Sequence, residues 1–172
     1  NSSREEEMDK MISPIVLMRL PLFAAMHRSP AARSEEDVER VTTLIGSSTA
    51  LLGAPLDLQK QVARMAMYRQ FPPSEVIVKE GDASEEYFII LAGIVNVVST
   101  ASADSLTEVV NRLRPGEGFG ELGILFGSSR TCTCVAATRG GVICAVLERE
   151  DYLHSLREYH SIANRYYDRY IY

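Results

Sequence analysis

Short runs of β-branched and aromatic residues with a period of two fill the middle of the chain, and they constrain its fold more than any other feature. Such side chains pack well on a pleated sheet. Proline and glycine residues separate the runs, and short strands at this spacing are typical of a β-barrel or a β-sandwich. The predicted strands begin near Tyr68 and include Val76–Val78, Tyr87–Leu91, Ile94–Val98, Leu106–Leu113, Thr131–Thr138 and Val142–Leu147.

Helical patterns precede this β region. Ser13-Pro14 is a helix-start signal, and Ser34 to Asp37 has the form of a capping box. Apolar residues at helical spacing follow the capping box, and Gly46 ends that pattern. A further helix is expected from about Asp57 to Met67. We expect residues 1–54 to form an N-terminal helical segment, and the helix from Asp57 to belong to the domain that follows it.

Helical patterns also follow the β region, at Glu148–Arg157 and again from about Ser161. The sequence thus predicts an α+β fold with helices, a β-roll at about 68–147, and C-terminal helices at 148–172. We expect residues 55–172 to form the main domain. The chain ends within a tyrosine-rich helical pattern, and we expect it to belong to a larger protein.

Composition argues against several classes of protein. The net charge of −5 is not that of a nucleic-acid-binding surface, which is usually basic. No run approaches about 18 apolar residues, so we expect no membrane span, and the start of the chain shows no secretory pattern. The three cysteines lack a C-x-x-C spacing, which favours reduced thiols over a disulfide or a zinc site. A cytoplasmic location is expected.

The segment Phe119–Cys132 carries the most informative chemistry, and strand pairing is expected to break around it. Its glycines permit a close approach of backbone to ligand, and Glu121–Phe126 is expected to form a short helical turn whose first N–H groups can bind an anion. Arg130 offers a planar fork for phosphate oxygens, and an ionised Glu121 accepts hydrogen bonds from hydroxyl groups. The alternative is an internal salt bridge between Glu121 and Arg130.

Several motifs accompany this acid and this base. They are Gly81-Asp82, Tyr87–Gly93, Leu113–Gly116, Phe119–Leu122 and Arg130-Thr131. With them, the sequence resembles the cyclic nucleotide-binding domain family, and most of all the domains of cyclic nucleotide-dependent kinase regulatory regions and their eukaryotic relatives. The resemblance covers about Ser34 to the end and is strongest over 68–150. It implies an eight-stranded antiparallel, jelly-roll-like β-roll flanked by N-terminal helices and by C-terminal hinge and lid helices.

The resemblance also implies ligand-binding roles within 119–132, the phosphate-binding cassette of the family. Glu121 would accept the ribose 2′-hydroxyl, Arg130 would pair with the cyclic phosphate, and Thr131 would help to select the base. Gly120 would approach the ribose. The remaining donors would be backbone N–H groups, those of Leu122, Gly123 and Cys132.

The C-terminal helices have roles in the family as well. The helix from Glu148 would act as a hinge, and the terminal helix would fold over the base as a lid. A tyrosine on that helix would then cap the base, and the candidates are Tyr166, Tyr167, Tyr170 and Tyr172.

The chain departs from the family pattern at four positions. Ser74 stands where many relatives have glycine, and Ser129 stands where they have proline. Gly123 and Cys132 both replace a frequent alanine. None of these changes removes a group that would contact the ligand. We therefore expect the chain to bind ligand, although its affinity can differ from that of relatives with the family pattern.

These observations predict a regulatory module that binds a cyclic nucleotide, with cAMP slightly favoured over cGMP. It would pass the signal through its C-terminal helices to an effector domain or protein outside the chain. Catalysis, metal binding and a further cofactor are not expected, because the three histidines lie outside the β-roll. Two alternatives stay open: the same fold binding another nucleoside or metabolite, or acting only in protein interactions. A bacterial-type transcription regulator with the same sensor domain is not expected. Such a protein would need a helix-turn-helix after the lid helix, and this sequence shows none up to Tyr172.

Overall fold

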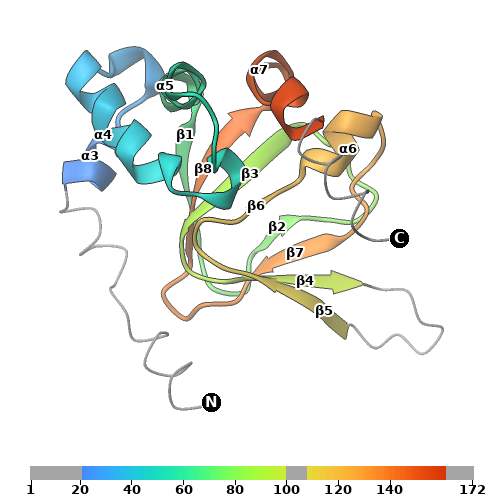
Figure 1. Cartoon of the computed structure of the whole chain (residues 1–172). Coiled ribbons are helices and arrows are strands. Elements are labelled where there is room, and N and C mark those ends of the chain that lie inside the picture. Colours follow the sequence, from blue (N-terminus) through green and yellow to red (C-terminus); the bar gives the residue numbers. More distant parts are fainter. Residues whose placement is uncertain (1–20, 100–107, 162–172) are drawn as a thin grey trace.

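Two antiparallel sheets of four strands each form the centre of the molecule (Figure 1). The computed structural model describes residues 21–99 and 108–161. The strand order is β1-β8-β3-β6 in one sheet and β2-β7-β4-β5 in the other. This arrangement confirms the predicted eight-stranded β-roll. The strands are β1 Met67–Phe71, β2 Val76–Val78, β3 Glu86–Ala92, β4 Val95–Ser99, β5 Glu108–Leu113, β6 Gly118–Phe119, β7 Thr133–Ala136 and β8 Val142–Glu148.

Strands β3 and β8 are buried on both faces, and this explains why they are apolar almost throughout. On β3, Phe88 and Ile90 face the core between the two sheets, whereas Tyr87 and Ile89 face the helices. Phe88 stacks on Phe119 with 4.8 Å between ring centroids. Successive side chains of a strand point to opposite faces, so one strand supplies both hydrophobic cores.

The N-terminal helices cover the outer face of the β1-β8-β3-β6 sheet (Figure 1). The predicted capping box is confirmed, because the Asp37 N–H donates to the Ser34 hydroxyl at 3.2 Å and the Ser34 N–H donates to the Asp37 carboxylate at 3.0 Å. Ser48 to Ala54 then lead into the last helix of this layer. The helices are α3 Pro21–His27, α4 Glu35–Gly46 and α5 Leu56–Met65, with short 3-10 turns η1 Pro30–Ala32 and η2 Thr49–Leu51.

Three boundaries differ from the sequence prediction. Helix α5 ends at Met65 because Ala66 is extended and Met67 already pairs with Val146 in the sheet. The expected break in pairing around the cassette is only partial, since Phe119 of β6 pairs with Phe88. After β8, helix α7 spans Arg149–Ser155, a turn falls at Leu156, and residues 157–161 are helical again.

Ser13-Pro14 and the four candidate lid tyrosines lie outside the described residues. Within 21–99 and 108–161, no helix has the length and the apolar character that crossing a membrane requires.

Candidate functional site

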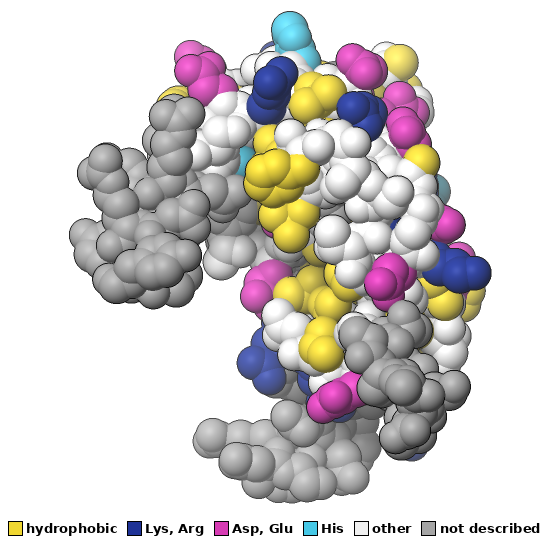
Figure 2. Space-filling model, turned by 90° about the vertical axis from the view of Figure 1, so that its right-hand side faces the viewer, with side chains coloured by type: hydrophobic (Ala, Val, Ile, Leu, Met, Phe, Trp, Pro, Cys, Tyr) yellow, Lys and Arg dark blue, Asp and Glu magenta, His cyan; other side chains and the backbone are white. Residues whose placement is uncertain are grey.

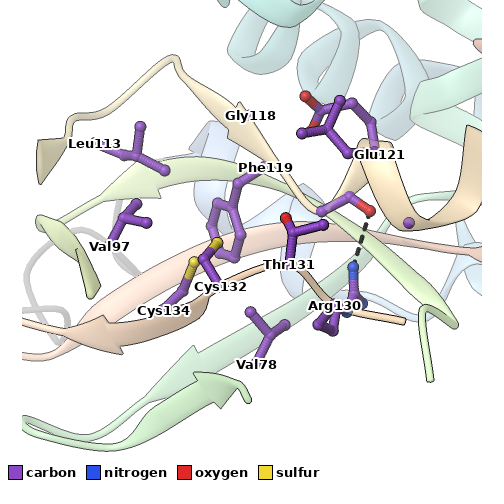
Figure 3. A pocket seen from close by; sticks show the side chains of 13 residues that line it. Val78, Val97, Leu113, Gly118, Phe119, Glu121, Arg130, Thr131, Cys132 and Cys134 are labelled. Carbon is purple, nitrogen blue, oxygen red and sulfur yellow. Dashed lines mark hydrogen bonds between the residues drawn. The ribbon is translucent and has the colours of Figure 1, made fainter. Parts of the chain in front are cut away.

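A cavity of about 230 Å³ lies between α6, which spans Glu121–Phe126, and the strands of the second sheet (Figure 3). Its wall includes all seven residues that the sequence predicted as ligand contacts: Gly120, Glu121, Leu122, Gly123, Arg130, Thr131 and Cys132. The other lining residues, which the sequence did not single out, are Val78, Val97, Leu113, Gly118, Phe119 and Cys134. One end of the cavity is thus polar and charged, and the other is apolar.

Gly120 is the N-cap residue of the short helix α6, and its φ of 95° is left-handed. A Cβ at this position would lie 2.7 Å from Nη1 of Arg130 and 3.0 Å from the carbonyl oxygen of Glu86. Both distances are shorter than van der Waals contact, and glycine alone adopts this φ without strain. Gly120 therefore allows the start of α6 and the Arg130 guanidinium to approach each other.

Arg130 is held in place from several sides, although it is only 8% exposed. Its guanidinium donates to the carbonyl oxygen of Gly120 at 2.8 Å and to that of Glu86 at 2.7 Å. It also lies over the Phe88 ring, 5.8 Å from the centroid. These partners are neutral, so the cation is oriented without being neutralised by a bonded carboxylate.

The backbone of Arg130 is fixed as well. Its N–H donates to the carbonyl of Asp82 at 2.8 Å, and its carbonyl accepts from the N–H of Gly81 at 2.9 Å. The Gly81-Asp82 motif, which lies outside the cavity, thus anchors the cassette. Burial lowers the pKa of the Arg130 guanidinium and the nearby Glu86 carboxylate partly offsets this, but an arginine stays protonated in proteins.

Glu121 and Arg130 do not form the internal salt bridge that the sequence left as an alternative. None of the ion pairs between described residues joins them. Figure 3 shows the Glu121 side chain turned away from Arg130. Burial, and after it the charge of Glu121, raises the pKa of the Tyr87 and Tyr152 hydroxyls. The acid and the base therefore address different regions of space.

The first turn of α6 places two further predicted residues at the cavity. The first N–H groups of an α-helix have no partner within the helix, and those of Leu122 and Gly123 belong to this turn. Gly123 packs against Ser84, because a Cβ there would lie 2.7 Å from the Ser84 Cβ and 2.9 Å from the Ser128 carbonyl oxygen. The Ser84 hydroxyl is buried and has no hydrogen-bond partner among the described residues.

Thr131 and Cys132 extend the cassette toward β7. Thr131 is exposed, and Cys132 is half-buried on the cavity wall. Cys134 lies next to Cys132 on the same wall, and it is buried. Burial, followed by the neighbouring Cys132, raises the pKa of the Cys134 thiol.

The C-terminal helical residues contact the N-terminal layer. The ring of His160 donates from Nε2 to the carbonyl oxygen of Ala50 at 2.9 Å, since a carbonyl can only accept, and Nδ1 accepts from the Tyr152 hydroxyl at 2.9 Å. The Tyr159 hydroxyl donates to the carbonyl of Leu52. The ring centroids of Tyr87 and Tyr152 are 4.9 Å apart, and α7 also contacts α6, the helix that begins at Glu121.

Groups of three or more side chains suited to hold a metal ion are not found within the two described ranges. The cavity is lined by one carboxylate, one guanidinium, the Thr131 hydroxyl, two thiols and apolar side chains.

Comparisons with known proteins show the family to which the chain belongs. A family model described as the cyclic nucleotide-binding domain matches residues 68–159. A cAMP-dependent protein kinase regulatory subunit of Debaryomyces hansenii is 30% identical over 123 residues, which are 72% of this chain and 26% of that protein. The chain thus spans about a quarter of the length of this curated relative.

Solved structures share the fold. The regulatory subunit of a cAMP-independent protein kinase A from Trypanosoma cruzi, bound to guanosine, is 27% identical with a TM-score of 0.68, covering 76% of this chain and 46% of that one. The regulatory domain of Toxoplasma gondii protein kinase A with cAMP has a TM-score of 0.69 at 18% identity, covering 77% and 50%. At 18% identity, the likeness to the Toxoplasma gondii domain concerns the fold alone.

Proposed function

Because the chain belongs to the cyclic nucleotide-binding domain family, we propose that its cavity binds a cyclic nucleotide and that the chain acts as a regulatory, non-catalytic module. The observation that carries this proposal is the state of Arg130. Its guanidinium lines the cavity, is buried, and is hydrogen-bonded to two neutral carbonyl groups. A buried charge requires a counter-charge, and the phosphate of a bound ligand supplies one.

The rest of the cassette fits the other parts of such a ligand. Glu121 accepts the ribose 2′-hydroxyl, and the N–H groups of Leu122, Gly123 and Cys132 donate to phosphate oxygens. Gly120 lies against the ribose. The apolar wall at Val78, Val97 and Leu113 takes up uncharged surface of the ligand. Thr131 is the one side chain of the set with a hydroxyl for the base. We propose cAMP ahead of cGMP on a separate ground, which is that the curated relative at 30% identity is a regulatory subunit of a cAMP-dependent protein kinase.

A nucleoside is the second candidate, and a specific observation favours it. The relative from Trypanosoma cruzi, at 27% identity, belongs to a cAMP-independent kinase and was solved with guanosine. A nucleoside carries the ribose and the base but not the phosphate. It would use Glu121 and leave Arg130 without a counter-charge.

Isothermal titration of the chain with cAMP, cGMP, adenosine and guanosine separates the two candidates. We expect both cyclic nucleotides to bind more tightly than either nucleoside, with cAMP first. Thermal denaturation provides a second readout, since a ligand that binds only the folded state raises the apparent stability. Tighter binding of guanosine or adenosine than of either cyclic nucleotide would overturn the proposal in favour of a nucleoside site.

The signal is proposed to leave through the C-terminal helices. Ligand bound at Glu121 changes the surroundings of Tyr152 on α7, and the helical residues up to 161 move with it toward a partner domain or protein. This is a shift between two populated states, driven by different ligand affinities. Superposable α7 positions in crystals with and without cAMP would count against it. The three free thiols support a cytoplasmic location within this proposal.

A further inference from the structure

An ion pair on the inner face of the first sheet lies next to the cassette without lining the cavity. The Arg69 guanidinium of β1 donates to both carboxylate oxygens of Glu86 on β3, at 2.6 and 2.8 Å. The two side chains are 37% and 29% exposed, so the pair is partly shielded from water. A bidentate arginine–carboxylate pair of this kind has a defined geometry.

The same Glu86 residue also holds Arg130. Its main-chain carbonyl accepts a hydrogen bond of 2.7 Å from the Arg130 guanidinium. Alternate residues of a strand share a face, so the Glu86 side chain is on the face of Phe88, over whose ring the Arg130 guanidinium lies. The Glu86 carboxylate and the Arg130 guanidinium are therefore neighbours on one face of β3. The electrostatic effect of Glu86 on Arg130 agrees with this placement.

One carboxylate thus lies between two arginines and is bonded to only one of them. Arg69 takes both of its oxygens, whereas Arg130 bonds to carbonyl groups. If the carboxylate turned to Arg130, it would form an internal pair, and a ligand phosphate would have to displace that pair before binding.

We propose that Arg69 sets the affinity of the cavity for an anionic ligand from outside it, by keeping the Glu86 carboxylate engaged and Arg130 unpaired. Arg69 is a positioning residue in this account, since it acts through Glu86 and Arg130. The inference rests on the proposed cyclic nucleotide site.

The test uses four variants of the chain and titration with cAMP. Arg69→Gln frees the Glu86 carboxylate, and we expect cAMP to bind about tenfold more weakly, in keeping with the loss of one charge-assisted hydrogen bond. Glu86→Gln removes the competing charge, and its affinity is expected to equal or exceed that of the wild type. The double variant Arg69→Gln/Glu86→Gln is expected to recover wild-type affinity.

The matched control is Arg64→Gln. Arg64 makes a similar bidentate pair with Glu35, at 2.7 Å for both bonds, but between helices α5 and α4 on the exposed surface. The Arg64→Gln substitution changes the net charge by the same amount as Arg69→Gln, and we expect it to leave the affinity for cAMP unchanged. A loss of affinity in this control would indicate that overall charge, rather than Glu86, is responsible.

The outcomes separate the inference from the function on which it rests. Wild-type affinity in Arg69→Gln would overturn the role of Arg69 while leaving cyclic nucleotide binding intact. If the double variant bound cAMP as weakly as Arg69→Gln does, the lost Arg69 charge, and not the freed carboxylate, would be the cause of the weaker binding. That result would also overturn the proposed role of Arg69. Lack of cAMP and cGMP binding by the wild type would overturn the proposed function itself. Thermal denaturation of each variant confirms that it is folded before titration.

Discussion

The Arg130 guanidinium donates a hydrogen bond of 2.8 Å to the main-chain carbonyl of Gly120. The two ends of the cassette are therefore joined before any ligand arrives, and the predicted phosphate-binding cation is fixed to the residue that starts α6. Preorganisation of this kind reduces the ordering that binding would otherwise require.

Replacement of Arg130 by alanine is expected to weaken cAMP binding about a hundredfold or more, because removing one partner of a buried charge pair costs about 3–5 kcal/mol. Isothermal titration measures the change. Arg139→Ala is the control, since Arg139 is exposed and does not line the cavity. Equal affinities of Arg130→Ala and the wild type would contradict the phosphate role.

Glu121 is expected to interact with one hydroxyl of the ligand, and an analogue can test this directly. Wild-type protein should bind 2′-deoxy-cAMP about tenfold or more weakly than cAMP, as expected for one charge-assisted hydrogen bond. In Glu121→Ala the two ligands should bind equally. Glu75→Ala, at an exposed position, should keep the wild-type difference. A persistent preference for the 2′-hydroxyl in Glu121→Ala would show that another group binds it.

Gly123 and Ser84 are expected to be coupled. In Gly123→Ala the new Cβ would collide with the Ser84 side chain, and we expect the free energy of unfolding to fall by about 1–3 kcal/mol, as in other overpacked sites. Adding Ser84→Gly should recover part of this loss, since the Ser128 carbonyl would still lie 2.9 Å from the Cβ. Urea denaturation of the four proteins in a double-mutant cycle measures the coupling. Strictly additive effects would show that the two positions are independent.

Ser74 lies in the turn between β1 and β2 with a φ of 66°, a conformation that disfavours side chains. This is the position at which many relatives have glycine. Ser74→Gly is expected to increase the free energy of unfolding by about 0.5–1 kcal/mol, because relief of strain exceeds the added chain entropy. Ser74→Ala keeps a Cβ and should bring no such gain. Equal stabilisation by alanine would mean that backbone conformation is not the cause.

The cysteines should differ in their reactivity. Burial raises the pKa of the Cys134 and Cys144 thiols, and thiolates are the reactive form. An aromatic disulfide reagent at about pH 8 is therefore expected to modify Cys132 first, and all three thiols only in denaturant. Saturating cAMP should slow the reaction at Cys132, since this residue lines the cavity. Cys132→Ala is the control, because it lacks the thiol that is expected to react first. If cAMP left the rate of Cys132 modification unchanged, the ligand would have to bind elsewhere.

Most of the fold could be predicted because most of its strands are short runs rich in β-branched and aromatic residues, separated by turn residues. Strand β6 was missed, since Gly118–Phe119 is too short to form a periodic pattern. The end of α5 was placed too late, because Ala66 and Met67 continue an apolar helical pattern and only pairing with β8 makes them extended. Local propensity is overridden by tertiary contacts at such boundaries.

The charged residues of the site were predictable, and their partners were not. Glu121 and Arg130 are the only acid and base in the cassette, so they stand out in the sequence. The apolar wall comes from strands far apart in the chain, and its residues look like ordinary core positions. The Arg69–Glu86 pair joins β1 and β3 across the intervening β8. Its existence depends on strand order, which composition and spacing do not specify.

The hydrogen bonds from Tyr159 and His160 to Leu52 and Ala50 have a consequence for how the chain could be divided. A fragment that started at residue 55 would lose both acceptors together with Leu51, and it would expose apolar residues of the same core cluster, including Tyr152 and Leu156. Displacement of the C-terminal helix would likewise disturb the turn that precedes α5. The segment that precedes α5 and the helical residues at 157–161 are therefore structurally coupled.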